Sequence, residues 1–119
     1  MNNDTESMVK RLSFENWIWF TFIIISVLDI YGDELLKKSL SGNDKIAQKK
    51  AHKIFLGVSI VSILIYIYFL MRNSKDYEKY HNKSYETRLI GSILILIGSI
   101  CLLYFQITTM QEIDSPSNV

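Results

Sequence analysis

Three apolar, uncharged runs constrain this chain more than any other feature of its sequence. They are Asn16–Leu28, Ile54–Met71 and Leu89–Phe105. An apolar segment of about 18 residues or more is typical of a helix that crosses a bilayer, because lipid offers no hydrogen-bond partners to an open backbone. The second and third runs meet or nearly meet that length, whereas the first ends at Asp29. We therefore predict an all-α integral membrane protein with three transmembrane helices in an up-down-up bundle.

The composition supports a membrane protein and argues against other classes. The segment Ile54–Met71 is apolar on every side, as a lipid-facing helix requires and an amphipathic soluble helix does not. A net charge of +1 is too small for a typical nucleic-acid-binding protein. Cys101 is the single cysteine, so no internal disulfide forms. We expect the lipid bilayer and either another membrane protein or a second copy of the chain as partners, without nucleic acid, metal or cofactor.

The polar residues between the runs set the expected limits of the helices. The predicted organisation is a polar tail over 1–13, a membrane domain over 14–111 and an acidic disordered tail over 112–119. The predicted helices cover about 14–40, 44–80 and 85–111. We expect Gly42 to end the first helix in a left-handed conformation, and Asn43 or Asp44 to cap the second.

The distribution of lysine and arginine gives a weak orientation signal. With three spans, the N-terminus and the 72–88 loop share one side, which carries seven basic residues against six on the other. Arg88 precedes the third run and no lysine or arginine follows it, which favours a cytoplasmic N-terminus under the positive-inside rule. A balance this even is also typical of a dual-topology protein. The abundance of Ile, Lys and Asn is typical of AT-rich bacterial genomes, so we expect a multi-pass protein of the bacterial plasma membrane.

A short motif is repeated in the third run. The segment Leu89–Ile93 (Leu-Ile-Gly-Ser-Ile) recurs as Leu96–Ile100. Seven residues are about two helical turns, so equivalent positions of the two copies share a face. Small residues let helices approach closely, and serine can hydrogen-bond to a neighbour. The pattern predicts a packing surface, either for another chain or for the first or second helix of the same chain. Its residues are Gly91, Ser92, Gly98 and Ser99.

Asp29 is the main candidate for chemistry inside the membrane. Trp17 and Trp19 are typical interfacial anchors, and Asp29 follows Trp17 by about 18 Å along a helix, within a hydrocarbon core of about 30 Å. A carboxylate there costs about 2.5–3.5 kcal/mol on insertion scales and needs a partner or a proton. The alternative is an ordinary helix flank, because Asp33 and Lys37 form an acid-first i, i+4 pair that is typical of a helix already in water.

The predicted topology brings polar residues of the other helices towards Asp29. One stripe of the second helix holds His52, Ser59, Ser62 and Tyr66. One stripe of the third helix holds Arg88, Ser92, Ser99 and Gln106. These stripes either line a narrow hydrated path or form hydrogen bonds between helices. The candidate ion- or proton-binding residues are Asp29, Asp33, His52, Ser59 and Gln106.

No catalytic motif accompanies these residues. The sequence contains no Gly-rich phosphate loop, metalloprotease helix motif or activated-serine motif, so no catalytic residue is assigned. We expect a small non-enzymatic membrane protein that acts through helix–helix interactions as an accessory, immunity or regulatory subunit. The alternative is a small oligomeric transporter or channel for protons or cations that uses Asp29. A third hypothesis is a lipid-modifying enzyme in which Asp29, Asp33, Glu34 and His52 hold a metal.

Overall fold

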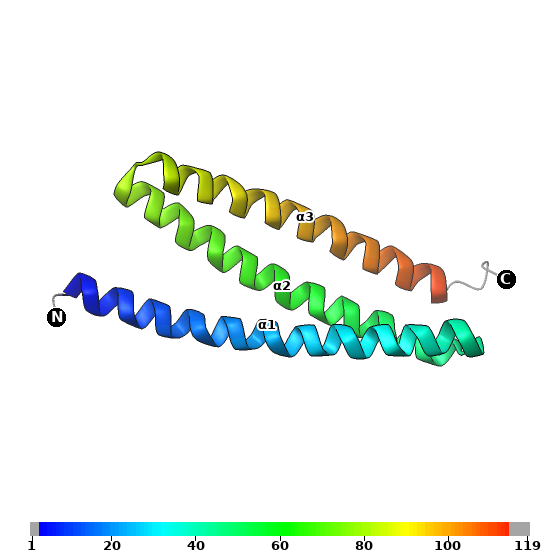
Figure 1. Cartoon of the computed structure of the whole chain (residues 1–119). Helices are drawn as coiled ribbons and strands as arrows, with labels where there is room; N and C mark the ends of the chain where they lie inside the picture. The colour runs from blue at the N-terminus through cyan, green and yellow to red at the C-terminus, as the bar shows by residue number, and fades with distance from the viewer. Residues whose placement is uncertain (1–2, 115–119) are drawn as a thin grey trace.

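The computed structural model describes residues 3–114, and this part of the chain is entirely helical. The helices are α1 (Asn3–Gly42), α2 (Lys45–Tyr80) and α3 (Lys83–Asp114). Figure 1 shows the three helices alternating in direction, with a tight turn between each pair. No strand occurs within residues 3–114. The predicted all-α class and the number of helices are confirmed.

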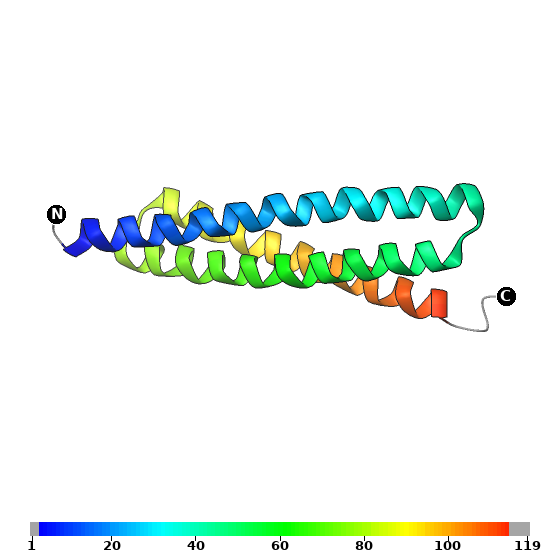
Figure 2. The ribbon, with the colours of Figure 1, turned by 90° about the horizontal axis from the view of Figure 1, so that it is seen from below.

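The other two helices both pack against the middle helix, α2. It packs against both α1 and α3, whereas among the described residues no Cα of α1 lies within 8 Å of a Cα of α3. Figure 2 shows α3 crossing α2 obliquely. The chain therefore forms an elongated, open layer of 62 × 25 × 17 Å rather than a closed bundle.

Two helices are long and apolar enough to cross a membrane. In their most apolar windows α2 and α3 have mean hydropathies of 2.5 and 2.2, and only 0% and 6% of those windows are buried; among the described residues, α1 is not one of the helices that are apolar enough. The solvent-accessible surface of 8634 Å² exceeds the area of about 6,700 Å² expected for a compact soluble protein of this mass. Much of the exposed surface of α2 and α3 is apolar, as is typical of contact with lipid or with another protein.

The first helix begins earlier than its composition suggests. The prediction places its start near residue 14, but α1 begins at Asn3, so most of the expected polar tail is helical. Glu6 and Lys10 form an i, i+4 pair at 3.8 Å, and Arg11 binds Asp76 of α2 at 3.0 Å. Polar residues therefore extend the helix through ion pairs. At the other end, α3 continues to 114 rather than 111, and residues 115–119 of the expected acidic tail lie outside the described residues.

The turn between α1 and α2 differs from the prediction in one residue. Asn43, with a φ of 53°, takes the left-handed conformation expected of Gly42. Asparagine tolerates this conformation because its short side chain can hydrogen-bond locally. Asp44 caps α2 as expected, and its carboxylate accepts a hydrogen bond from the backbone N–H of Ile46 at 3.1 Å.

A seven-residue repeat organises the packing of α1 on α2. The buried positions that follow it are Ile18, Ile25, Gly32 and Ser39. This spacing is typical of helices that pack with a left-handed crossing. At Gly32 the helices approach closely, because a Cβ there would lie 2.6 Å from Cε1 of Phe55 in α2.

Candidate functional site

The most buried charged side chains lie at the end of the molecule where all three helices meet. Glu15 of α1 is 4% exposed and Asp76 of α2 is 6% exposed. Glu15 directly precedes the first apolar run, and Asp76 lies shortly after the second run ends at Met71. Along the helix axes, both carboxylates therefore lie close to the ends of the apolar runs. Neither was among the predicted site residues.

Glu15 joins α1 to α2. Its Oε1 accepts a hydrogen bond from Nη1 of Arg72 at 2.7 Å, and its Oε2 accepts one from the Tyr68 hydroxyl at 3.1 Å. Nε of Arg11, one turn earlier in α1, lies 3.9 Å from the same Oε2. Both carboxylate oxygens are thus engaged, which offsets the cost of burying the charge.

Asp76 connects side chains of all three helices. Nη1 of Arg11 in α1 lies 3.0 Å from its Oδ1, and Nη2 of Arg88 in α3 lies 3.7 Å from its Oδ2. Partial burial disfavours the charged form of Arg11, but the hydrogen bond and charge of Asp76, with the charge of Glu15, outweigh it and raise the pKa of Arg11 above its ordinary value. Arg11 is therefore a permanent cation at this junction.

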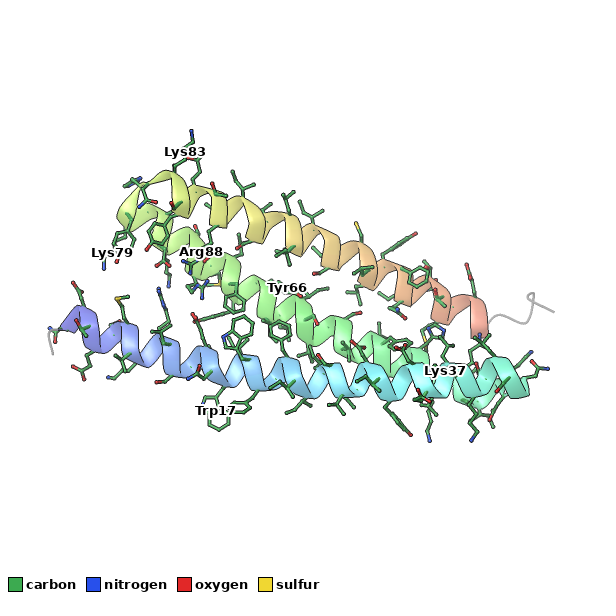
Figure 3. All side chains as sticks on the ribbon, viewed as in Figure 1. Trp17, Lys37, Tyr66, Lys79, Lys83 and Arg88 are labelled. Atoms are coloured by element: carbon green, nitrogen blue, oxygen red, sulfur yellow. The ribbon has the colours of Figure 1, made fainter. Side chains whose placement is uncertain are left out.

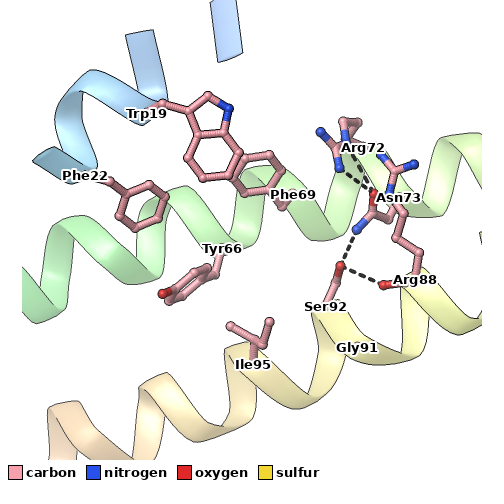
Figure 4. Close-up of a pocket in the computed structure, with 10 residues that line it drawn as sticks. All are labelled: Trp19, Phe22, Tyr66, Phe69, Arg72, Asn73, Arg88, Gly91, Ser92 and Ile95. Carbon is pink, nitrogen blue, oxygen red and sulfur yellow. Dashed lines mark hydrogen bonds between the residues drawn. The ribbon is translucent and has the colours of Figure 1, made fainter. Parts of the chain in front are cut away.

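A hydrogen-bonded chain continues from these ion pairs into α3. Asn73, which is 4% exposed, accepts hydrogen bonds from Arg72 through Oδ1 and donates one to the Ser92 hydroxyl through Nδ2. The Ser92 hydroxyl in turn donates to the carbonyl of Arg88 at 3.0 Å. Figure 4 shows this chain of contacts linking the two helices. We name the residues of the junction the polar cluster: Arg11, Glu15, Tyr68, Arg72, Asn73, Asp76, Arg88 and Ser92.

Beside the polar cluster lies an apolar groove of about 570 Å³. Its walls are Trp19 and Phe22 of α1, Tyr66 and Phe69 of α2, and Ile95 of α3 (Figure 4). Its polar end is formed by Arg72, Asn73, Arg88 and Ser92, next to Gly91. The groove exists because α1 and α3 stay apart over α2. In Figure 3, Arg88 lies at the end of the molecule that also carries Lys79 and Lys83, and Tyr66 lies towards its middle.

Most of the predicted ion-binding residues lie around a second cavity. It has a volume of about 270 Å³, and its polar lining residues include Asp29, Ser59, Ser62, Ser99 and Gln106. The structure thus brings the expected stripes of α2 and α3 together with the carboxylate of α1. Tyr66 lines both this cavity and the apolar groove, so its side chain lies between them.

Two of the predicted residues take other positions. His52 is buried and its Nδ1 lies 3.3 Å from Oε1 of Gln106, at the edge of the second cavity. Asp33 instead borders a separate surface hollow near Glu34 and Lys37. Lys37 pairs with Glu34 at 3.0 Å, not with Asp33 as its spacing suggests. Within the described part of the chain, no three His, Cys, Asp or Glu side chains are placed to hold a metal ion.

The repeated motif of α3 divides between two surroundings. Ser92 is buried against α2, and Ser99 borders the second cavity while donating to the Ile95 carbonyl at 2.8 Å. Gly91 and Gly98 are different, because a Cβ added at either would meet no atom within 4 Å. The serines therefore serve contacts within this chain, and the glycines leave open space beside α3.

A spacing in the sequence could have revealed the polar cluster. Arg11 with Glu15 and Arg72 with Asp76 repeat the same arginine-first i, i+4 pattern next to two apolar runs. No protein-family model matches the chain, and no curated protein or solved structure matches it. The fold and the site define an all-helical protein with two helices able to cross a membrane and a buried polar cluster at one end.

Proposed function

We propose that this chain is a three-span protein of the bacterial plasma membrane with a cytoplasmic N-terminus. In addition to α2 and α3, we propose that α1 also spans the membrane. It runs antiparallel to α2 and is joined to it by Glu15 and Arg72 near one end and by Gly32 and Phe55 towards the other. A helix fixed along a membrane-crossing neighbour in this way crosses with it. The exposed apolar side chains of α1, such as Ile24 at 59% exposure, fit contact with lipid.

We further propose a non-enzymatic role as an accessory, immunity or regulatory subunit that binds another membrane protein or a second copy of itself. The observation that carries this proposal is the open glycine edge of α3, where Gly98 is exposed and has free space at its Cβ position. Helices in lipid associate by close backbone approach at small residues. The serines of the same motif make hydrogen bonds within the chain and Gly91 borders the apolar groove, which leaves Gly98 for an external helix.

Gly98→Leu tests this role directly. The protein is extracted gently from its host membrane, and native mass spectrometry compares the wild type with Gly98→Leu. Gly57→Leu in α2 is the matched control, since its Cβ position is equally open and the added side chain is identical. We expect a bound second protein, or a dimer, that Gly98→Leu removes and Gly57→Leu retains. A wild-type protein that is always a lone monomer contradicts the proposal.

The second cavity supports one alternative, a small oligomeric transporter or channel for protons or cations. Asp29, Ser59 and Gln106 line the same space, so a carboxylate and neutral oxygen ligands converge on it from three helices. Carboxylate, hydroxyl and amide oxygens are suited to hydrated cations and to proton transfer. Asp29→Asn, compared with the wild type in a liposome flux assay, tests this alternative.

A further inference from the structure

The polar cluster carries more positive than negative charge. Its guanidinium groups belong to Arg11, Arg72 and Arg88, and its carboxylates to Glu15 and Asp76. The ion pair of Arg88 with Asp76, at 3.7 Å, is longer than the shortest ion pairs of Arg11 (3.0 Å) and Arg72 (2.7 Å), and the Arg88 side chain is 40% exposed. Arg72, by contrast, is held by Glu15 and Asn73 and is 15% exposed. The surplus charge is therefore most accessible at Arg88.

Arg88 stands at the polar end of the apolar groove. From Arg88 the wall of α3 continues along the groove to Ile95, about 10 Å further along the helix axis. Trp19 and Phe22 form the facing wall on α1 (Figure 4). An accessible cation thus lies at one end of an open apolar channel, at the level where the apolar runs of α2 and α3 meet polar residues.

We propose that this groove binds one anionic phospholipid, with its phosphate at Arg88 and the upper part of an acyl chain between Trp19, Phe22 and Ile95. Arginine suits a phosphate because its planar donors can form two charge-assisted hydrogen bonds with it. The inference rests on the membrane placement proposed above but not on any protein partner. With a cytoplasmic N-terminus, the groove faces the leaflet whose surface potential is negative.

A lipid fits this groove better than a helix does. The groove covers only about two helical turns along α3, and the polar cluster closes it at one end. A helix from another protein would need to continue past Arg88 and Asp76, whose contact connects α3 to α2. A phospholipid ends where the cluster begins, and its charge complements the surplus there.

Native mass spectrometry of the purified full chain in nonionic detergent tests the proposal. Phosphatidylglycerol and phosphatidylcholine with the same acyl chains are titrated separately, and glycerol phosphate is added as a chain-free competitor. We expect preferential retention of one phosphatidylglycerol, which glycerol phosphate does not displace. Arg88→Gln is expected to weaken that retention about fivefold, the effect of losing one cation at an anionic surface. Arg88→Lys should restore most of it.

Two further variants separate the charge from the groove. Lys83→Gln removes an exposed cation at the start of α3 that does not border the groove, and should leave phosphatidylglycerol retention unchanged. Gly91→Leu adds a side chain to the groove wall, at a position where a Cβ would meet no atom within 4 Å, and should reduce retention of both lipids, whereas Gly57→Leu should not. Circular dichroism establishes that each variant is folded.

Specific outcomes overturn the proposal. They are equal retention of the two lipids by the wild type, equal losses in Arg88→Gln and Lys83→Gln, and unchanged retention in Gly91→Leu. Displacement by glycerol phosphate would assign the site to free phosphates, and a bound protein lost only in Gly91→Leu would assign the groove to a helix. Failure to find any protein partner leaves the lipid result intact, so the two proposals fail separately.

Discussion

The side-chain amide of Asn73 in α2 donates a hydrogen bond to the Ser92 hydroxyl in α3, and this contact ties α3 to the ion pairs of α1. The same amide group accepts from Arg72 through its oxygen, and Arg72 binds Glu15 of α1 at 2.7 Å. One buried amide therefore lies at the centre of the contacts among three helices. Its loss would affect both α1 and α3, although within residues 3–114 no Cα atoms of these two helices lie within 8 Å of each other.

Ser92→Ala should lower the free energy of unfolding by about 1 kcal/mol, because the Asn73 amide loses its acceptor on α3. The measurement is reversible unfolding by sodium dodecyl sulfate in mixed micelles. Ser99→Ala is the matched control, since the Ser99 hydroxyl donates to the carbonyl of Ile95 in its own helix. Equal effects of the two substitutions would contradict a special role for the contact between Asn73 and Ser92.

Asp76→Asn should destabilise the protein by about 2 kcal/mol, less than a fully buried pair because Arg88 is partly exposed. Amide hydrogen exchange should quicken over residues 3–15, since Arg11 loses its partner on α2. Glu34→Gln, which breaks an exposed pair with Lys37, should have little effect on stability. An unchanged exchange pattern in Asp76→Asn would count against the polar cluster as the anchor of α1.

The contribution of Arg11 should not change on mild alkalinisation. Its pKa is raised in the folded protein, so the stabilisation is fully present below its ordinary value and is lost only as the pH rises through the raised one. Moving to about pH 10 therefore leaves the guanidinium charged. The difference in melting temperature between the wild type and Arg11→Gln should therefore be the same at neutral pH and at about pH 10. A difference that shrinks at the higher pH would refute this account.

Gly32→Leu should weaken the packing of α1 on α2 by about 1–3 kcal/mol, because the new side chain enters space held by the Phe55 ring. Adding Phe55→Ala should recover part of this loss, which a double-mutant cycle measures. Gly57→Leu, with open space at its Cβ position, should have little effect. Simple additivity in the cycle would indicate that Gly32 and Phe55 are not coupled.

If the second cavity conducts, Asp29→Asn should abolish proton or cation flux in liposomes while leaving assembly intact. Asp33→Asn is the matched control, because Asp33 borders a different hollow and should not alter flux. The readout is a pH-sensitive dye trapped in proteoliposomes under an imposed potential. Equal flux in the wild type and Asp29→Asn would reject the transporter alternative.

Patterns local to one segment could be predicted from the sequence, and contacts between segments only in part. The expected second helix over 44–80 agrees with α2 (Lys45–Tyr80), since an apolar run with a capping aspartate defines it locally. The stripes containing Ser59 and Gln106 do converge, because seven-residue periodicity fixes a helix face. The early start of α1 and the ion pairs of Glu15 and Asp76 were not predicted, although Ser92 was named as a packing residue. Charges next to apolar runs are common, and only the crossing of the helices determines which of them, such as Arg11 and Asp76, become paired.

The spacing of Ile18, Ile25, Gly32 and Ser39 also restricts how this protein can change in length. Inserting seven residues into each helix preserves the buried face and lengthens the molecule by about 10 Å. An insertion that is not a multiple of seven breaks this spacing and turns Gly32 away from Phe55. Adaptation to a thicker or thinner bilayer would therefore come in steps of two helical turns, with helix tilt making the finer adjustment.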